Sequence, residues 1–330
     1  MSNKIKAVLL LLTASFIWGI SFPLNRYALN YIDPFGYTAL RYLFGTLAFL
    51  PLAMRLGRRI APAGYFTRIN KFSWLWGGLL AGCLLTIGNG LQYYGLTMTT
   101  SAKAGFMNSL YVTMVPLFGF VLGVIPARAV WLGLAVSLAG LYFVSDPWSV
   151  QGFNRGDALV LVADLFFAIH VFVLGYFTVR VSSWLFIFSQ TFFGCLLGFL
   201  VAEMTGSFPT LEQFKGIWPL AVWGIFSVSG AYICQALAQR HTTPTSAALV
   251  MQSQSIIAAV CGVVFLREPM TEIMVFGAFL LISGTVTAQL ATDSTKLSPG
   301  HPHFLGWQAL RVLVAFLILA VCIMGVIRTG

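Results

Sequence analysis

Two ionisable residues, Asp164 and His170, stand within one long apolar segment of the sequence. An ionised carboxylate inside an apolar helix costs several kcal/mol unless it meets water or a partner. Asp164 is therefore either a proton- or cation-binding group facing a cavity or a protonated carboxyl bonded to a neighbouring helix. His170 titrates near physiological pH, so it is a second candidate for proton coupling and for a cavity, with a bond to a nearby helix as the alternative.

Amide and aromatic side chains recur at similar depths in other apolar segments. Such groups turn away from lipid, and they either bond neighbouring helices or surround a shared polar cavity. Amides donate and accept hydrogen bonds, which suits a zwitterionic or polyhydroxylated solute, and aromatic rings stack on aromatic or cationic solutes. The cavity candidates are Trp18, Asn89, Gln92, Asn108, Tyr111, His170, Tyr232, Gln235, Gln252 and Gln254.

Other reactive residue types give less evidence of a functional site. Arg41 and Lys103 fall near predicted helix ends, where we expect their charged groups to snorkel to the membrane surface. The five cysteines lie in apolar segments without a C-x-x-C pair, and His301 and His303 alone are too few for a metal site. We therefore expect no catalytic residue, no metal and no cofactor.

The composition shows which solvent surrounds these side chains. The 330 residues are 58% hydrophobic and only 8% charged, with a mean hydropathy of +0.87. Soluble domains carry about 25% charged residues, so this chain must be embedded in lipid. That excludes most soluble enzymes and nucleic-acid binders despite the net charge of +10. The expected partners are a small-molecule substrate and membrane lipid, with a homodimer left open and no nucleic acid.

A spanning helix needs about 20 predominantly apolar residues. The hydropathy pattern predicts an all-α polytopic membrane protein with spans near residues 6–27, 34–54, 72–96, 102–125, 127–144, 156–179, 183–204, 216–238, 245–266, 271–290 and 306–327.

The basic residues predict the orientation. Cytoplasmic loops collect Lys and Arg. With the N-terminus in the cytoplasm, 12 basic residues fall inside and 7 fall outside. The first apolar segment resembles a signal peptide, but its polar and aromatic residues recur later, so we interpret it as an uncleaved helix. We expect a multi-pass protein of the cell inner membrane.

The chain also repeats itself. A shift of 143 residues aligns Gln92 with Gln235, and a shift of 149 aligns Ser21 with His170 and Arg41 with Gln190. The repeat predicts two five-helix halves, 1–150 and 151–292, followed by a polar linker and an extra helix in 293–330. Because five is odd, the halves enter the membrane from opposite faces. Inverted repeats are typical of secondary transporters.

Four segments resemble the EamA-type members of the drug/metabolite transporter superfamily. They are residues 16–22 (FIWGISF), 99–116 (TTSAKAGFMNSLYVTMVP), 166–170 (FFAIH) and 238–249 (AQRHTTPTSAAL), the last followed by Leu266-Arg-Glu-Pro269. The resemblance covers about residues 6–291. It implies ten helices, a central cavity lined mainly by helices 1, 3, 4, 6, 8 and 9, and export of small metabolites.

Two departures from the family pattern stand out. The Glu often found before the Pro that closes the fourth helix is Ile125 here, while the second half keeps Glu268. The segment 306–327 exceeds the ten helices of the family. Altogether the sequence predicts a secondary transporter that exports an amino-acid-like or other small solute by alternating access, with proton coupling left open. An importer is the alternative, and a membrane-embedded enzyme or a channel is less favoured.

Overall fold

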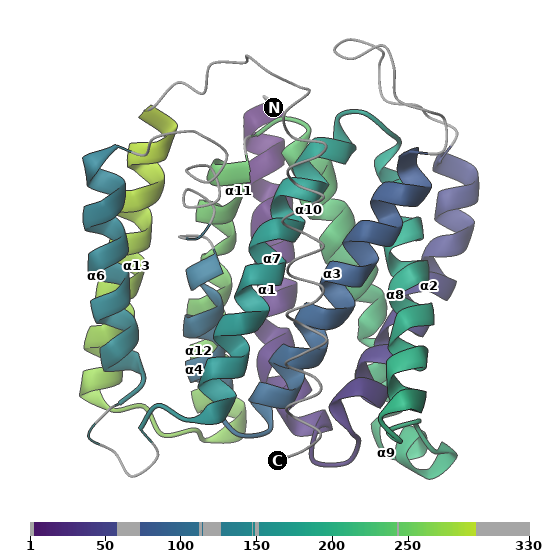
Figure 1. The fold of residues 1–330 in the computed structure, drawn as a ribbon, viewed down its shortest axis with the longest axis horizontal. Helices are drawn as coiled ribbons and strands as arrows, with labels where there is room; N and C mark the ends of the chain where they lie inside the picture. Colours follow the sequence, from purple (N-terminus) through teal and green to yellow (C-terminus); the bar gives the residue numbers. More distant parts are fainter. Residues whose placement is uncertain are drawn as a thin grey trace.

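The computed structural model describes residues 3–57, 73–111, 114, 127–146, 148, 152–242 and 244–294. All regular structure in this part of the chain is helical (Figure 1). The helices before residue 150 are α1 (Asn3–Ala28), α2 (Pro34–Leu56), α3 (Ser73–Leu96), α4 (Ser101–Asn108) and α6 (Arg128–Val144). The later ones are α7 (Arg155–Thr178), α8 (Ser183–Met204), α9 (Leu211–Val222), the π-helix η1 (Ile225–Gly230), α10 (Ala231–Gln239), α11 (Pro244–Met251), α12 (Ser253–Leu266) and α13 (Glu272–Ser294).

The described helices agree with the predicted spans to within a few residues, with two exceptions that concern shape. The predicted span 216–238 is a bent pair, in which α9 meets the unit Ile225–Gln239 at 40°. The predicted span 245–266 is divided at Gln252 into α11 and α12. Most of the predicted span 102–125 beyond α4, and all of 306–327, lie outside the described residues.

Five described helices are long and apolar enough to cross a membrane, or six if the bent pair counts as one span. Their outward surfaces are apolar, with large side chains such as Phe16, Leu47 and Leu196 more than half exposed. The chain therefore has the apolar exterior and the internally bonded backbone that lipid demands. The all-α polytopic membrane fold that the sequence predicts is confirmed, and the inverted relation of its halves stays a prediction.

The helices pack in a pattern that brings early and late parts of the chain together. α6 and α13 pair at one edge of the bundle, α2 and α8 lie toward the other, and α1 runs through the middle (Figure 1). Between these edges, α1 packs on α12 and α10, and α7 packs on α3 and α4. The centre of the bundle is thus built by helices from both sides of residue 150.

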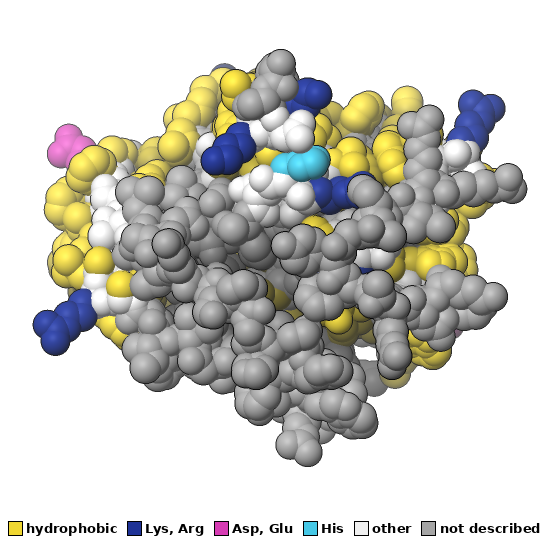
Figure 2. Space-filling model, turned by 90° about the horizontal axis from the view of Figure 1, so that it is seen from above, with side chains coloured by type: hydrophobic (Ala, Val, Ile, Leu, Met, Phe, Trp, Pro, Cys, Tyr) yellow, Lys and Arg dark blue, Asp and Glu magenta, His cyan; other side chains and the backbone are white. Residues whose placement is uncertain are grey.

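The end of the bundle that carries the N-terminus combines hydrophobic side chains with several Lys and Arg side chains among its described residues (Figure 2). Among the 12 basic residues counted as inside, Arg58, Arg59, Arg68 and Lys71 lie outside the described residues. The cytoplasmic N-terminus therefore stays a prediction.

Candidate functional site

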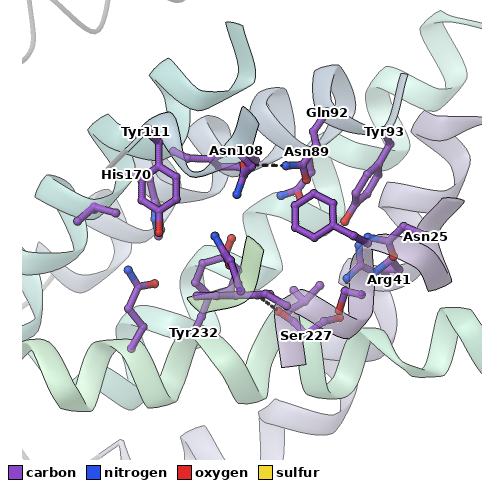
Figure 3. Close-up of a pocket in the computed structure, with 18 residues that line it drawn as sticks. Asn25, Arg41, Asn89, Gln92, Tyr93, Asn108, Tyr111, His170, Ser227 and Tyr232 are labelled. Atoms are coloured by element: carbon purple, nitrogen blue, oxygen red, sulfur yellow. Dashed lines mark hydrogen bonds between the residues drawn. The ribbon is translucent and has the colours of Figure 1, made fainter. Parts of the chain in front are cut away.

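A polar cavity lies inside the bundle, between helices from both sides of residue 150 (Figure 3). The space open to the centres of water molecules measures about 80 Å³, which is room for several waters at ~10–15 Å³ each. Eighteen residues surround it: Trp18, Ser21, Phe22, Asn25, Arg41, Asn89, Gln92, Tyr93, Asn108, Tyr111, Phe167, His170, Val171, Ser227, Val228, Tyr232, Gln235 and Gln254. Aromatic and amide side chains dominate this wall.

One end of the cavity is formed around Arg41, which lies beside Asn25 and Tyr93 (Figure 3). Arg41 is only 3% exposed. Its Nη2 donates to Ser227 Oγ at 2.6 Å, and its guanidinium lies 5.5 Å and 5.2 Å from the ring centres of Tyr37 and Tyr93. The expectation that Arg41 snorkels to the membrane surface was wrong, because α2 turns this side chain into the bundle instead.

Close packing between α2 and the bent α9–η1 region positions Arg41. A Cβ at Gly224 would collide with the backbone of Arg41, so only glycine lets the chains approach this closely. The π-helix then carries Ser227 into the cavity wall, where its backbone oxygen accepts a hydrogen bond from Trp18 Nε1 at 2.9 Å. π-helical turns inside α-helices occur frequently at functional sites.

The middle of the cavity is edged by paired amides. Gln92 Nε2 donates to Asn108 Oδ1 at 2.8 Å, which joins α3 to α4. Asn89 donates to Tyr42 Oη at 3.1 Å and to Leu85 O at 2.8 Å. These bonds fix the amide orientations, as a preformed site for a polar solute requires.

The opposite end of the cavity is formed by His170 and Tyr111 (Figure 3). His170 Nε2 lies 2.9 Å from Gln190 Oε1, so this ring nitrogen carries the proton and donates. The Tyr232 ring packs edge-on against His170 at 5.3 Å and against Trp18 at 5.0 Å. This end is therefore aromatic and uncharged when His170 is neutral.

The structure brings together nine of the ten predicted cavity residues and leaves out one. Gln252 is 3% exposed but is not part of the wall, and its side chain has no hydrogen-bond partner in the described part of the chain. Asp164 is fully buried and also lies outside the wall. Neither of its carboxyl oxygens has a hydrogen-bond partner among the described residues.

The comparisons with known proteins identify the chain's relatives. The model of the EamA-like transporter family matches residues 5–146 and again residues 154–289. The chain belongs to this family. It is therefore a multi-pass membrane transporter, and the EamA resemblance seen in its motifs is confirmed.

Individual relatives agree with the family. An "Uncharacterized transporter" of Archaeoglobus fulgidus is 27% identical over 87% of both chains. The "Uncharacterized inner membrane transporter YedA" of Escherichia coli K12 is 21% identical over 87% of this chain and 90% of its own. A crystal structure with 18% identity and a TM-score of 0.61 covers 89% of this chain and 99% of that one, which establishes a shared fold.

Within this EamA-family fold a second polar region lies at the start of α4. Lys103 Nζ forms an ion pair with Asp157 Oδ2 at 3.1 Å and donates to Gly152 O at 2.8 Å. Glu268 accepts hydrogen bonds from the backbone of Ser101 and Ala102 at 2.7 and 2.9 Å, so it caps α4 from the far side of the chain. We call Lys103, Asp157, Glu268 and Ser101 the α4 junction.

The contacts of the α4 junction show that the expectation for Lys103 was wrong, and they give Glu268 a structural role. Lys103 is 5% exposed, so it is buried in an ion pair and does not snorkel. Arg267 adopts a left-handed φ of 53° that ends α12 and directs Glu268 toward α4. The corresponding first-half position, Ile125, lies outside the described residues. No group of three or more His, Cys, Asp or Glu in the described chain could hold a metal ion.

Sequence reasoning missed half of the cavity wall. The missed residues are Ser21, Phe22, Asn25, Arg41, Tyr93, Phe167, Val171, Ser227 and Val228. Ser21 and Arg41 carried a usable signal, because the 149-residue shift aligns them with His170 and Gln190, which bond one another. Serines and valines in apolar helices carry no such signal.

Proposed function

We propose that this EamA-family transporter carries a small polar solute through the cavity between its two halves, and that it works as an exporter of an amino-acid-like or similar metabolite. One observation supports this most strongly. The cavity wall combines amides, aromatic rings and hydroxyls from helices on both sides of residue 150. A site placed between two bundles is accessible from alternate sides when the bundles rock against each other.

The amide-rich wall favours an amino-acid-like solute. Asn89, Gln92 and Asn108 offer donors and acceptors within one small space. Such a wall matches the ammonium and carboxylate groups of an amino acid better than it matches an apolar drug. The importer alternative uses the same cavity, so the direction of transport has to be measured.

Counterflow tests the carrier mechanism. Full-length protein is first screened against a metabolite panel, because a ligand that binds the folded state raises its unfolding temperature. The hits are then measured as labelled-solute exchange in proteoliposomes. A carrier accumulates label against an unlabelled internal pool. Equilibration without accumulation indicates a channel, and no solute-dependent flux for any hit would overturn the proposal.

Proton coupling through Asp164 is the second part of the proposal. Asp164 precedes Phe167, which lines the cavity, by almost one helical turn of α7. A fully buried carboxyl without a hydrogen-bond partner in the described chain is poised to change protonation when water reaches it. His170 lies on the same helix and lines the cavity, and it is a second proton carrier in the proposal.

A pH gradient separates these roles. Asp164→Asn keeps the size of the side chain and removes its proton. We expect counterflow without a gradient to survive in this variant and gradient-driven flux to be lost. His170→Gln serves as the comparison. Gradient-driven flux at the wild-type level in Asp164→Asn would exclude Asp164 as the coupling group.

A further inference from the structure

The guanidinium of Arg41 lies in the cavity wall with most of its hydrogen-bond donors unpaired in the described structure. Its Nε and Nη1 atoms are buried and have no hydrogen-bond partner among the described residues. Only Nη2 is engaged, by Ser227 at 2.6 Å. The rings of Tyr37 and Tyr93 flank the cation and hold it in place, but ring faces do not replace in-plane acceptors.

The cavity wall supplies no countercharge to this cation. None of the described residues that surround the cavity is Asp or Glu. Asp157, Glu268 and Asp164 all lie outside the wall: Asp157 pairs with Lys103, and Glu268 caps α4. A buried cation without a countercharge is costly, so this end of the cavity leaves the charge of Arg41 uncompensated by the described wall.

Asn25 adds a second polar group at the same end of the cavity. Its Oδ1 accepts a hydrogen bond from Tyr37 Oη at 3.1 Å, and Figure 3 shows its side chain beside Arg41. With the oxygen engaged, the amide nitrogen of Asn25 is the atom left to meet a solute. This end of the cavity therefore presents mainly donors.

The repeat gives an independent argument. The position aligned with Arg41 in the second half is Gln190, a neutral residue that bonds His170. Packing of the equivalent helix thus requires no charge at this position. The charge of Arg41 is an addition to one half alone, as a binding group for one end of an asymmetric solute would be.

We propose that Arg41 binds the anionic group of the transported solute, a carboxylate, with Asn25 as a further donor. This inference rests on the proposed function and narrows it: the solute carries a carboxylate that enters the Arg41 end, while its remaining part lies toward Tyr232 and His170. Arginine suits this role because its planar donors match the geometry of a carboxylate.

The test compares matched solutes with and without the carboxylate. Alanine, leucine and phenylalanine are each paired with their primary amide and with the corresponding amine, and the affinity of each for the full-length protein is measured from thermal stabilisation in detergent. We expect the best-bound acid to bind at least tenfold more tightly than its amide and its amine. Equal affinity of acid and amide would overturn the inference without any mutation.

Variants locate the effect. Arg41→Gln is expected to lower acid affinity at least tenfold and to leave amide affinity unchanged, while Arg41→Lys retains part of the acid affinity. Arg26→Gln is the matched control. It removes the same positive charge, but Arg26 lies outside the cavity wall. Unchanged acid affinity in Arg41→Gln contradicts the inference. Counterflow of the acid that does not depend on Arg41 contradicts the inference alone, whereas absence of counterflow for every solute contradicts the proposed function.

Discussion

The α4 junction and the cavity both draw on helices α4 and α7. The polar side chains of the junction are paired, whereas several of those in the cavity are not. At the α4 junction Lys103 faces Asp157, and Glu268 accepts from Ser101 and Ala102. In the cavity, Arg41 leaves two nitrogen atoms and Gln235 leaves its Oε1 without a partner among the described residues. The polar groups of the first region bond one another, whereas the second keeps unpaired polar atoms that the proposed solute would engage.

This difference separates structural from binding roles. A buried charge that loses its partner destabilises the fold, whereas replacement of an unpaired polar group costs little. Substitutions in the α4 junction should therefore lower the unfolding free energy strongly and affect transport little. Substitutions in the cavity should leave the unfolding free energy nearly unchanged and lower the rate of transport. The following variants test that contrast.

The largest expected effect is at the ion pair. Lys103→Met leaves the fully buried carboxyl of Asp157 without its cation, and we expect a loss of about 3–5 kcal/mol in unfolding free energy. Thermal unfolding in detergent measures it. The double variant Lys103→Met with Asp157→Asn should recover part of the loss, and strictly additive losses would argue against a pair.

A smaller effect is expected at the cap of α4. Glu268→Gln removes the charge that faces the helix N-terminus and weakens the bonds to Ser101 and Ala102. We expect a loss of about 1–3 kcal/mol. Glu272→Gln, an exposed residue in the first turn of α13, is the control. Equal losses in both variants would contradict the role of Glu268 as the cap of α4.

In the cavity, Arg41→Met should change the unfolding free energy by only about 1 kcal/mol or less. The lost bond to Ser227 and the lost ring contacts are offset by the removal of two unpaired buried donors. The same thermal measurement applies. A loss as large as that of Lys103→Met would assign Arg41 a structural role and would break the contrast between the two regions.

The smallest effect is expected at Gln252. Neither side-chain atom has a hydrogen-bond partner in the described chain, so Gln252→Leu should be neutral or stabilise the fold by about 1 kcal/mol or less. Thermal unfolding and counterflow are both measured. A clear loss of stability would reveal a hydrogen bond of Gln252 that forms in another conformation of the transporter.

Hydropathy was sufficient to predict most helices, because lipid requires about 20 apolar residues for each span. It could not predict the bend between α9 and η1 or the break at Gln252, since both depend on local packing within apolar sequence.

Some residues of the cavity wall could be predicted from the sequence and others could not. Polar residues in apolar segments must turn inward, so Gln92, Asn108 and His170 were predictable members of its wall. Arg41 was not, because its position near a helix end suggested snorkelling. Its burial depends on the contact with Gly224, far away in the sequence, and only the folded chain displays that contact.

Two glutamines test whether the cavity is the transport site. Gln235 lines the cavity and Gln252 does not, yet both are buried and both keep unpaired polar atoms in the described structure. Labelled-solute counterflow is measured for Gln235→Leu and Gln252→Leu in proteoliposomes. We expect at least a tenfold loss of exchange in Gln235→Leu and wild-type exchange in Gln252→Leu. Equal exchange in both variants would contradict the cavity as the transport site.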